Sequence, residues 1–269
     1  MHPIGLAPLT VLELAPPDLV TCAVEAGFDF VGLRLIPATA EEVQHPMVGD
    51  TPMVRETTRR IADAGIAVLD VEIFRLRPQT DVERDYRAAL ETAARFGARE
   101  ALVAGNDPDE ARVIDRFAQF CDLAQEFGIG ANLEPMPWTD IKSFAQGMRV
   151  VEAAAHDSGG VLIDPIHFDR GGSRASEIGT CAPRRVRYLQ FCDAPAERPT
   201  DTATLLFQAR AARLMPGDGG LDLKGIARAV PPDVPISLEI PMDALAKTLP
   251  ALDRTRQMLA KTKRLLASL

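Results

Sequence analysis

Short apolar runs alternate with longer amphipathic segments along the whole chain. The runs are mostly apolar on both faces, as in parallel strands that are covered by helices. This pattern predicts eight strands, at residues 4–9, 29–36, 67–74, 100–105, 129–134, 160–164, 186–192 and 235–240.

The segments between these runs carry the residues that favour helix ends. Pro16 opens the first segment and Gly27 closes it, while Thr51 precedes a proline at the start of the second. We expect helices at residues 16–26, 51–65, 81–96, 107–127, 140–155, 174–181, 222–229 and 242–267, the last of them broken or bent near Pro250.

Eight such strand–helix units in 269 residues match the size of a (β/α)₈ barrel. The alternative is an open doubly wound sheet, which usually has a glycine-rich phosphate turn after its first strand. The corresponding segment here reads PLTVLEL and contains no glycine. We see no linker or repeat, and we therefore expect an α/β fold with one TIM-barrel domain over residues 1–269.

Composition and charge narrow the classes of function. The net charge of −8 argues against nucleic-acid binding, because phosphates require a basic face. No apolar run approaches the roughly 18 residues of a membrane span, and the N-terminus does not resemble a signal peptide. The cysteines lie far apart without a CxxC pair, which is typical of reduced thiols in a cytoplasmic protein; they are Cys22, Cys121, Cys181 and Cys192.

Four consecutive strands carry an oxygen-bearing side chain at or near their carboxyl end. These side chains are Glu134, Asp164, Gln190 and Glu239, and a proline closely follows each of the three acids. The carboxyl ends of barrel strands share one face, so these groups are expected to converge. Clustered carboxylates repel one another unless a cation lies between them. Oxygen ligands favour Mg²⁺ or Mn²⁺, with Co²⁺ or Zn²⁺ as alternatives. Without a metal, the four residues would be solvated polar side chains at the strand ends.

Four further residues are candidates for the same site. His167 follows Asp164 by three residues and would share a face with it on a short helical turn, where it could bind substrate, assist proton transfer or orient the site. Arg34 and Glu72 lie late in the second and third strands. They would form a structural ion pair with each other or contact the substrate. Trp138 is either an apolar wall for the substrate or part of the core.

The connection between Asp193 and Leu221 is unusually long. An excursion of this length on the active-site face of a barrel is usually a binding loop or lid. We therefore expect residues 194–220 to form a loop or lid over the site.

Six motifs together resemble the xylose isomerase-like TIM-barrel superfamily, which includes sugar isomerases, epimerases and the endonuclease IV fold. They are AGFDFVGLR, LEP, DPIH, YLQFCD, RLMPGDGGLDL and SLEIP, and the resemblance covers essentially the whole chain. It implies that the metal ligands are Glu134, Asp164, Gln190 and Glu239. It also implies that the two glutamates act as acid and base on opposite faces of the substrate, and that Arg213 contacts substrate hydroxyls.

Gln190 departs from the histidine that tagatose-type epimerases of this superfamily carry. Glutamine at this position is familiar in its 3-dehydroshikimate dehydratases, so a lyase stays open beside the leading hypothesis. That hypothesis is a divalent-metal isomerase or epimerase that moves a proton beside a carbonyl of a small polyhydroxylated substrate, through an enediolate.

Two other classes of function are alternatives. An endonuclease of this superfamily would use several zinc ions and many histidines, whereas this acidic chain has four histidines. A non-catalytic sugar-binding protein is the remaining alternative. The sequence leaves open whether the chain forms a homodimer or a homotetramer.

Overall fold

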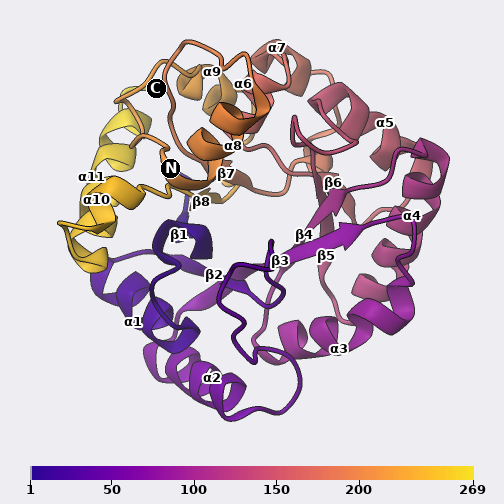
Figure 1. The fold of residues 1–269 in the computed structure, drawn as a ribbon, viewed down its shortest axis with the longest axis horizontal. Coiled ribbons are helices and arrows are strands. Elements are labelled where there is room, and N and C mark those ends of the chain that lie inside the picture. Colours follow the sequence, from indigo (N-terminus) through magenta and orange to yellow (C-terminus); the bar gives the residue numbers. More distant parts are fainter. Residues whose placement is uncertain (1) are drawn as a thin grey trace.

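Eight parallel strands surround the centre of the protein in the computed structural model, which describes residues 2–269 (Figure 1). They are β1 (Ile4–Leu6), β2 (Phe30–Arg34), β3 (Ala67–Leu76), β4 (Glu100–Gly105), β5 (Gly130–Glu134), β6 (Gly159–Val161), β7 (Leu189–Phe191) and β8 (Ile236–Leu238). The order β6-β5-β4-β3-β2-β1-β8-β7 brings the last strands beside the first. Between β6 and β7, an isolated parallel bridge joins Ile163 to Leu189, and the N–H of Gln190 donates to the carbonyl of Ile163 at 3.1 Å. The expected α/β TIM barrel is therefore confirmed.

Most of the helices cover the outside of this barrel (Figure 1). The helices are α1 (Pro16–Ala26), α2 (Pro52–Ala64), α3 (Val82–Arg95), α4 (Glu110–Glu126), α5 (Phe144–Ala154), α6 (Pro165–Arg170), α7 (Ala175–Ile178), α8 (Thr202–Ala211), α9 (Leu223–Arg228), α10 (Asp243–Ala246) and α11 (Ala251–Leu266), with 3₁₀ turns η1 (Pro8–Val11) and η2 (Pro183–Arg185). The predicted end signals operate as expected: Thr51 accepts a hydrogen bond from the N–H of Val54, and Gly27 adopts a left-handed conformation with φ of 87°. Each helix among residues 2–269 is too short or too polar to cross a lipid bilayer.

The structure shortens or divides several of the predicted elements. The strand expected over residues 4–9 ends at Leu6, because Pro8 cannot donate to a ladder and opens η1 instead. The strands expected over 160–164, 186–192 and 235–240 are shortened to β6, β7 and β8. The last helix, expected over 242–267, is divided into α10 and α11, and Pro250 stands in extended conformation at the start of α11.

The buried apolar side chains form two clusters. The larger one fills the space between the strands and the helices, and its members include Val31, Val71, Phe117 and Leu238. The smaller one draws on other positions of the same strands, with Phe30, Leu69, Ile73, Leu102, Leu162 and Tyr188 among its members. Successive strand residues point to opposite faces, so the smaller cluster occupies the barrel interior beneath the carboxyl ends of the strands.

Residues 194–220 form more than a loop, because they contain helix α8, which lies over the barrel end beside β7 and β8 (Figure 1). The second half of this segment is fixed by Asp193, whose carboxylate accepts hydrogen bonds from the N–H groups of Gly217 at 3.0 Å, Gly219 at 2.9 Å and Leu221 at 3.1 Å. A β-carbon on Gly219 would lie 2.2 Å from the carbonyl oxygen of Ala194, so only glycine allows this approach. The role of the segment as a lid stays a prediction.

Asp193→Ala should lower the free energy of unfolding by about 2–4 kcal/mol, because it leaves several amide donors without their charged acceptor. The control is Asp201→Ala, which removes only the N-terminal cap of α8 and should cost about 1 kcal/mol. Urea denaturation of both variants measures the difference. Equal losses would mean that the Asp193 carboxylate does not hold the segment together.

Candidate active site

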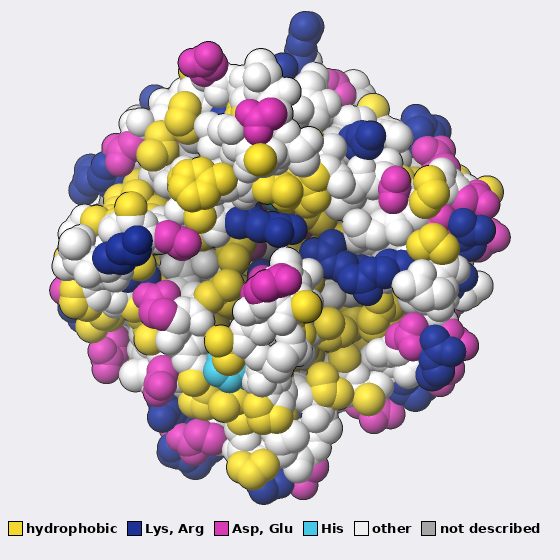
Figure 2. All heavy atoms as spheres, viewed as in Figure 1, with side chains coloured by type: hydrophobic (Ala, Val, Ile, Leu, Met, Phe, Trp, Pro, Cys, Tyr) yellow, Lys and Arg dark blue, Asp and Glu magenta, His cyan; other side chains and the backbone are white. Residues whose placement is uncertain are grey.

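The four predicted strand-end residues converge on one end of the barrel. Glu134 ends β5, Asp164 follows β6, Gln190 is in β7 and Glu239 follows β8, and all four are buried. A cavity of about 380 Å³ opens at this end. Its lining includes Glu134, Glu239, His167 and the arginines Arg34, Arg75, Arg210 and Arg213. Figure 2 shows this face with basic side chains around a central hollow.

Three buried side chains form a group that could hold a metal ion. Ligand atoms of Glu134, Asp164 and His167 all lie within 4.8 Å of one another. The Nε2 atom of His167 is 3.7 Å from Oε1 of Glu134 and 3.6 Å from Oδ2 of Asp164. The local cause is helix α6, since Asp164 is its N-cap and His167 lies one turn later on the same face. The i+3 relation expected from DPIH is therefore present.

Unsatisfied atoms in this group support a bound cation. Among residues 2–269, no side chain or backbone group makes a hydrogen bond to Oε1 of Glu134 or to Nδ1 of His167, although both atoms are buried. A buried carboxylate oxygen without a donor is costly, and a divalent cation would satisfy it. The residues present therefore fit a divalent metal ion.

Arg213 forms ion pairs with two of the acids, Asp164 and Glu239. Its Nη1 atom is 2.5 Å from Oδ2 of Asp164, and its Nη2 atom is 2.7 Å from Oε2 of Glu239. Its Nε atom donates to the carbonyl of Ala209 at 2.7 Å, and the residue is only 2% exposed. Arg213 lines the cavity as expected, but its strongest contacts are to carboxylates, so it also fixes the positions of Asp164 and Glu239.

Gln190 connects Glu239 to the third strand. Its Nε2 atom donates to Oε1 of Glu239 at 3.0 Å and lies 3.4 Å from Oε1 of Glu72. Its Oε1 atom is buried and finds no hydrogen-bond partner within the described chain. The side-chain carbonyl oxygen is therefore free to accept a further donor or to face a cation.

Arg34 and Glu72 form the ion pair that the sequence suggested, with 2.7 Å between Nη2 and Oε2. Arg34 also binds Glu42, at 2.9 Å and 3.0 Å to its two carboxylate oxygens. These two carboxylates raise the pKa of the Arg34 guanidinium, although burial alone would lower it. Glu42 was not predicted, because it lies in an irregular loop where no periodicity marks an inward position. Arg34 and Glu72 both line the cavity, so a role in substrate contact stays a prediction.

Trp138 lies at the wall of the cavity, in edge contact with His167 at 4.7 Å between ring centroids. The guanidinium of Arg210, on α8, is 5.9 Å from the centroid of the Trp138 ring. Sequence reasoning missed both Arg210 and Arg75. A charged residue within the apolar run of β3 was a usable signal for Arg75, whereas α8 shows no clear amphipathic pattern that would mark Arg210.

A family model described as xylose isomerase-like TIM barrel matches residues 20–265. The chain belongs to this family. Inosose isomerase of Bacillus velezensis is 20% identical over 220 residues, which are 77% of this chain and 75% of that protein.

Two solved structures share the fold of this xylose isomerase-like barrel. The structure titled IolI protein with a binding zinc atom has a TM-score of 0.78 and 16% identity, and the match covers 97% of this chain and 96% of that one. The probable 3-DHS dehydratase AsbF from Bacillus anthracis has a TM-score of 0.72 and 15% identity, with 99% of each chain covered.

In this xylose isomerase-like barrel, the surroundings raise the pKa values of the two glutamates and lower those of Asp164 and His167. Burial raises the pKa of Glu134 well above its ordinary value, and the nearby carboxylates of Glu239 and Asp164 add to the shift. Burial also raises the pKa of Glu239 to about 8, against the opposite effect of Arg213. The pKa of Asp164 is lowered, because Arg213 and His167 outweigh its burial. Burial lowers the pKa of His167 to about 4, so its imidazole is neutral at pH 7.

The shift at Glu239 predicts how the metal-free protein depends on pH. Its pKa rises from 4.5 in the unfolded chain to about 8 in the fold, so the folded state holds a proton that the unfolded state releases. This contribution to stability is complete below pH 4.5 and is lost as the pH rises to about 8. Glu239→Gln cannot titrate, so its stability should fall less steeply over this range. Urea midpoints measured with a chelator present test this, and parallel profiles would contradict it.

Proposed function

We propose that the chain is a divalent-metal-dependent isomerase or epimerase, which transfers a proton beside the carbonyl of a small polyhydroxylated substrate. The observation that carries this proposal is the pair Glu134 and Glu239. Both carboxyls line one cavity and both are buried. Burial raises the pKa of Glu134 and raises that of Glu239 to about 8, and a raised pKa lets a carboxyl give a proton as well as take one. The similarity to inosose isomerase supports a polyol ketone as the substrate class.

The chain offers a set of ligands for the metal. Glu134, Asp164 and His167 form the group that fits the cation, and Gln190 and Glu239 complete the set predicted from the sequence. When bound, the cation would act as a Lewis acid toward the substrate's carbonyl oxygen. An oxygen-rich set favours Mn²⁺ or Mg²⁺, whereas a contribution from His167 would favour Zn²⁺ or Co²⁺.

The remaining residues hold the substrate and the two acids in position. One glutamate removes the proton from the carbon beside the carbonyl, and the other returns a proton, to a neighbouring atom or to the opposite face. Arg213 keeps Glu239 and Asp164 in place through its two contacts. Arg34, Glu72 and Trp138 line the same cavity and are proposed to contact the hydroxyl groups and carbon skeleton of the substrate.

A dehydratase is the second candidate. Gln190 and the likeness in fold to the probable 3-DHS dehydratase favour it. The same residues would then act in an elimination, in which one glutamate removes the proton beside the carbonyl and the other protonates the hydroxyl group that leaves as water.

A substrate panel tests both candidates. The protein, supplied with Mn²⁺, is incubated with keto-sugars, inososes and 3-dehydroshikimate, and the products are analysed by NMR and chromatography. Interconversion of epimers or of aldose and ketose supports the isomerase. Protocatechuate formed only from 3-dehydroshikimate supports the dehydratase. Binding without turnover of any compound would contradict both.

Gln190→His should shift the metal preference of the site from Mg²⁺ or Mn²⁺ toward Zn²⁺ or Co²⁺. Both side chains are neutral, but imidazole nitrogen is a softer ligand than an amide oxygen. Affinity and activity across the four metals, in both proteins, measure the shift. If Gln190 only holds Glu239 and Glu72 by its amide donor, the variant should be weaker with every metal and the rank order should not change.

A further inference from the structure

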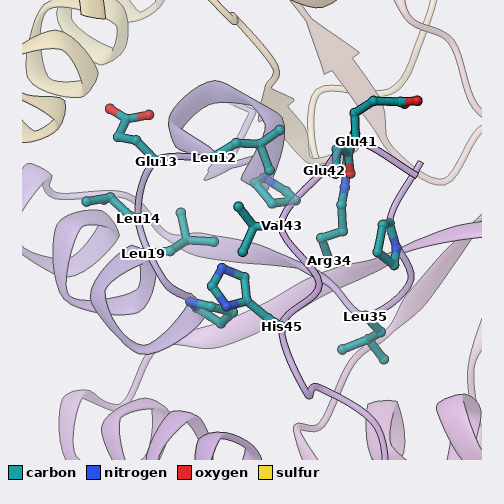
Figure 3. Close-up of a pocket in the computed structure, with 13 residues that line it drawn as sticks. Leu12, Glu13, Leu14, Leu19, Arg34, Leu35, Glu41, Glu42, Val43 and His45 are labelled. Carbon is teal, nitrogen blue, oxygen red and sulfur yellow. The ribbon is translucent and has the colours of Figure 1, made fainter. Parts of the chain in front are cut away.

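A second cavity, of about 300 Å³, lies beside the candidate active site (Figure 3). The segment after β1 and the loop after β2 form its walls. Most of its lining is aliphatic, including Leu12, Leu14, Leu19, Leu35 and Val43. This volume is at the lower end of the range of about 300–1,000 Å³ found for ligand sites. We call this cavity the annex.

The annex adjoins the active-site cavity. Leu12, Arg34 and Glu42 line both. Figure 3 shows Arg34 extending toward Glu42 at the edge of the annex, where the two residues form an ion pair. Side chains, not backbone alone, therefore separate the two cavities, and a molecule bound at Glu134 and Glu239 would reach the annex by displacing them.

Most charged groups around the annex have partners or point away from it, and the imidazole of His45 is a further polar group in its lining. Arg34 is neutralised by Glu72 and Glu42, and Glu42 also accepts a hydrogen bond from the N–H of Ala38 at 2.9 Å. Glu13 is paired with Arg254. The carboxylate of Glu41 points away from the cavity in Figure 3. An ionic group entering the annex would therefore meet mainly aliphatic walls and paired charges, with His45 as the one additional polar side chain of the lining, which disfavours an ionic occupant.

Apolar surface at the mouth of the annex lacks a cover. Val43 is 70% exposed and Leu12 is 36% exposed, although both line the cavity. Single exposed apolar residues are common, but two at the rim of an aliphatic cavity are the arrangement that an uncharged apolar group would bury.

We infer that the annex binds an uncharged apolar group, alkyl or aryl, attached to the polyhydroxylated part of the substrate that occupies the active site. The inference rests on the proposed function for the polar part. The natural substrate class is then a polyol ketone that carries an apolar substituent at the end remote from its carbonyl. The occupant belongs to the substrate, because the annex shares its lining with the active-site cavity.

The test uses the 6-O-methyl, 6-O-butyl and 6-O-hexyl ethers of D-fructose, with calorimetric Kd values in the presence of Mn²⁺. Each additional methylene that enters the annex should tighten binding by about twofold to fourfold. Val43→Asp places a charge at the mouth and should remove this dependence on chain length. Val24→Asp is the matched control, because Val24 is an exposed valine on α1 that does not line the annex.

Two results would overturn the inference: equal affinity for the three ethers, or the same chain-length dependence in Val43→Asp as in the unaltered protein. If no ether binds, the proposed function fails for this substrate class, and 1-hexanol then tests the annex alone through the methyl NMR shifts of its leucines. Hexanol shifts that Val43→Asp abolishes and Val24→Asp keeps would support the apolar subsite. Shifts that survive Val43→Asp, or no shifts at all, would overturn it.

Discussion

Glu239→Gln is expected to lower kcat by about 10²–10⁴-fold, because it removes a group that gives and takes the transferred proton. Glutamine has nearly the same shape and can still accept the hydrogen bond from Gln190. The fold should therefore persist while proton transfer is lost. Glu134→Gln should have an effect of similar size, since the reaction requires both an acid and a base.

Glu100→Gln is the matched control for these variants. Glu100 is also a largely buried carboxyl whose pKa is raised by burial, but it begins β4, pairs with Asn132 and does not line the cavity. Its replacement should leave kcat nearly unchanged. A fall in kcat of less than tenfold in Glu239→Gln, or an equal fall in Glu100→Gln, would show that proton transfer does not depend on these glutamates.

Removal of the metal is expected to lower turnover by about 10³-fold or more, because Lewis-acid stabilisation is worth several kcal/mol. Added Mn²⁺ should restore it. Metal binding should also raise the melting temperature of the unaltered protein, since the ion binds only the folded chain. This second measurement does not depend on knowing the substrate.

Asp164→Asn should lose most of the bound metal, because it removes one charge from the group that fits the cation. Asp169→Asn is the control, since Asp169 lies on the same helix α6 but pairs with Arg170 and Arg198. Elemental analysis of both variants gives the metal content per chain. Metal retained by Asp164→Asn would show that Asp164 is not a ligand. Full turnover by protein treated with a chelator would show that the reaction does not need the metal.

The positions of Glu134, Asp164 and His167 followed from local signals. An apolar run that ends in an acid marks a strand end, barrel geometry brings such ends together, and an i+3 spacing places His167 beside Asp164. These rules use only the order of elements and their periodicity. They therefore bring these three side chains together without any knowledge of long-range contacts.

Long-range pairings could not be predicted in the same way. The contact of Gln190 with both Glu72 and Glu239 depends on side-chain rotamers across the barrel. The ion pair of Arg34 with Glu42 depends on the path of an irregular loop. Helix α8 carries little amphipathic pattern, so the segment that contains Arg210 read as a loop.

Deuterium exchange tests the central proposal, proton transfer beside a carbonyl, most directly. The protein is incubated with Mn²⁺ and each keto-sugar or inosose in D₂O, and ¹H NMR follows the hydrogen on the carbon next to the carbonyl. For the true substrate class we expect the unaltered protein to remove the ¹H signal of this hydrogen. The double variant Glu134→Gln/Glu239→Gln should leave the signal unchanged. Turnover that leaves no deuterium in either substrate or product would contradict proton transfer by these two glutamates.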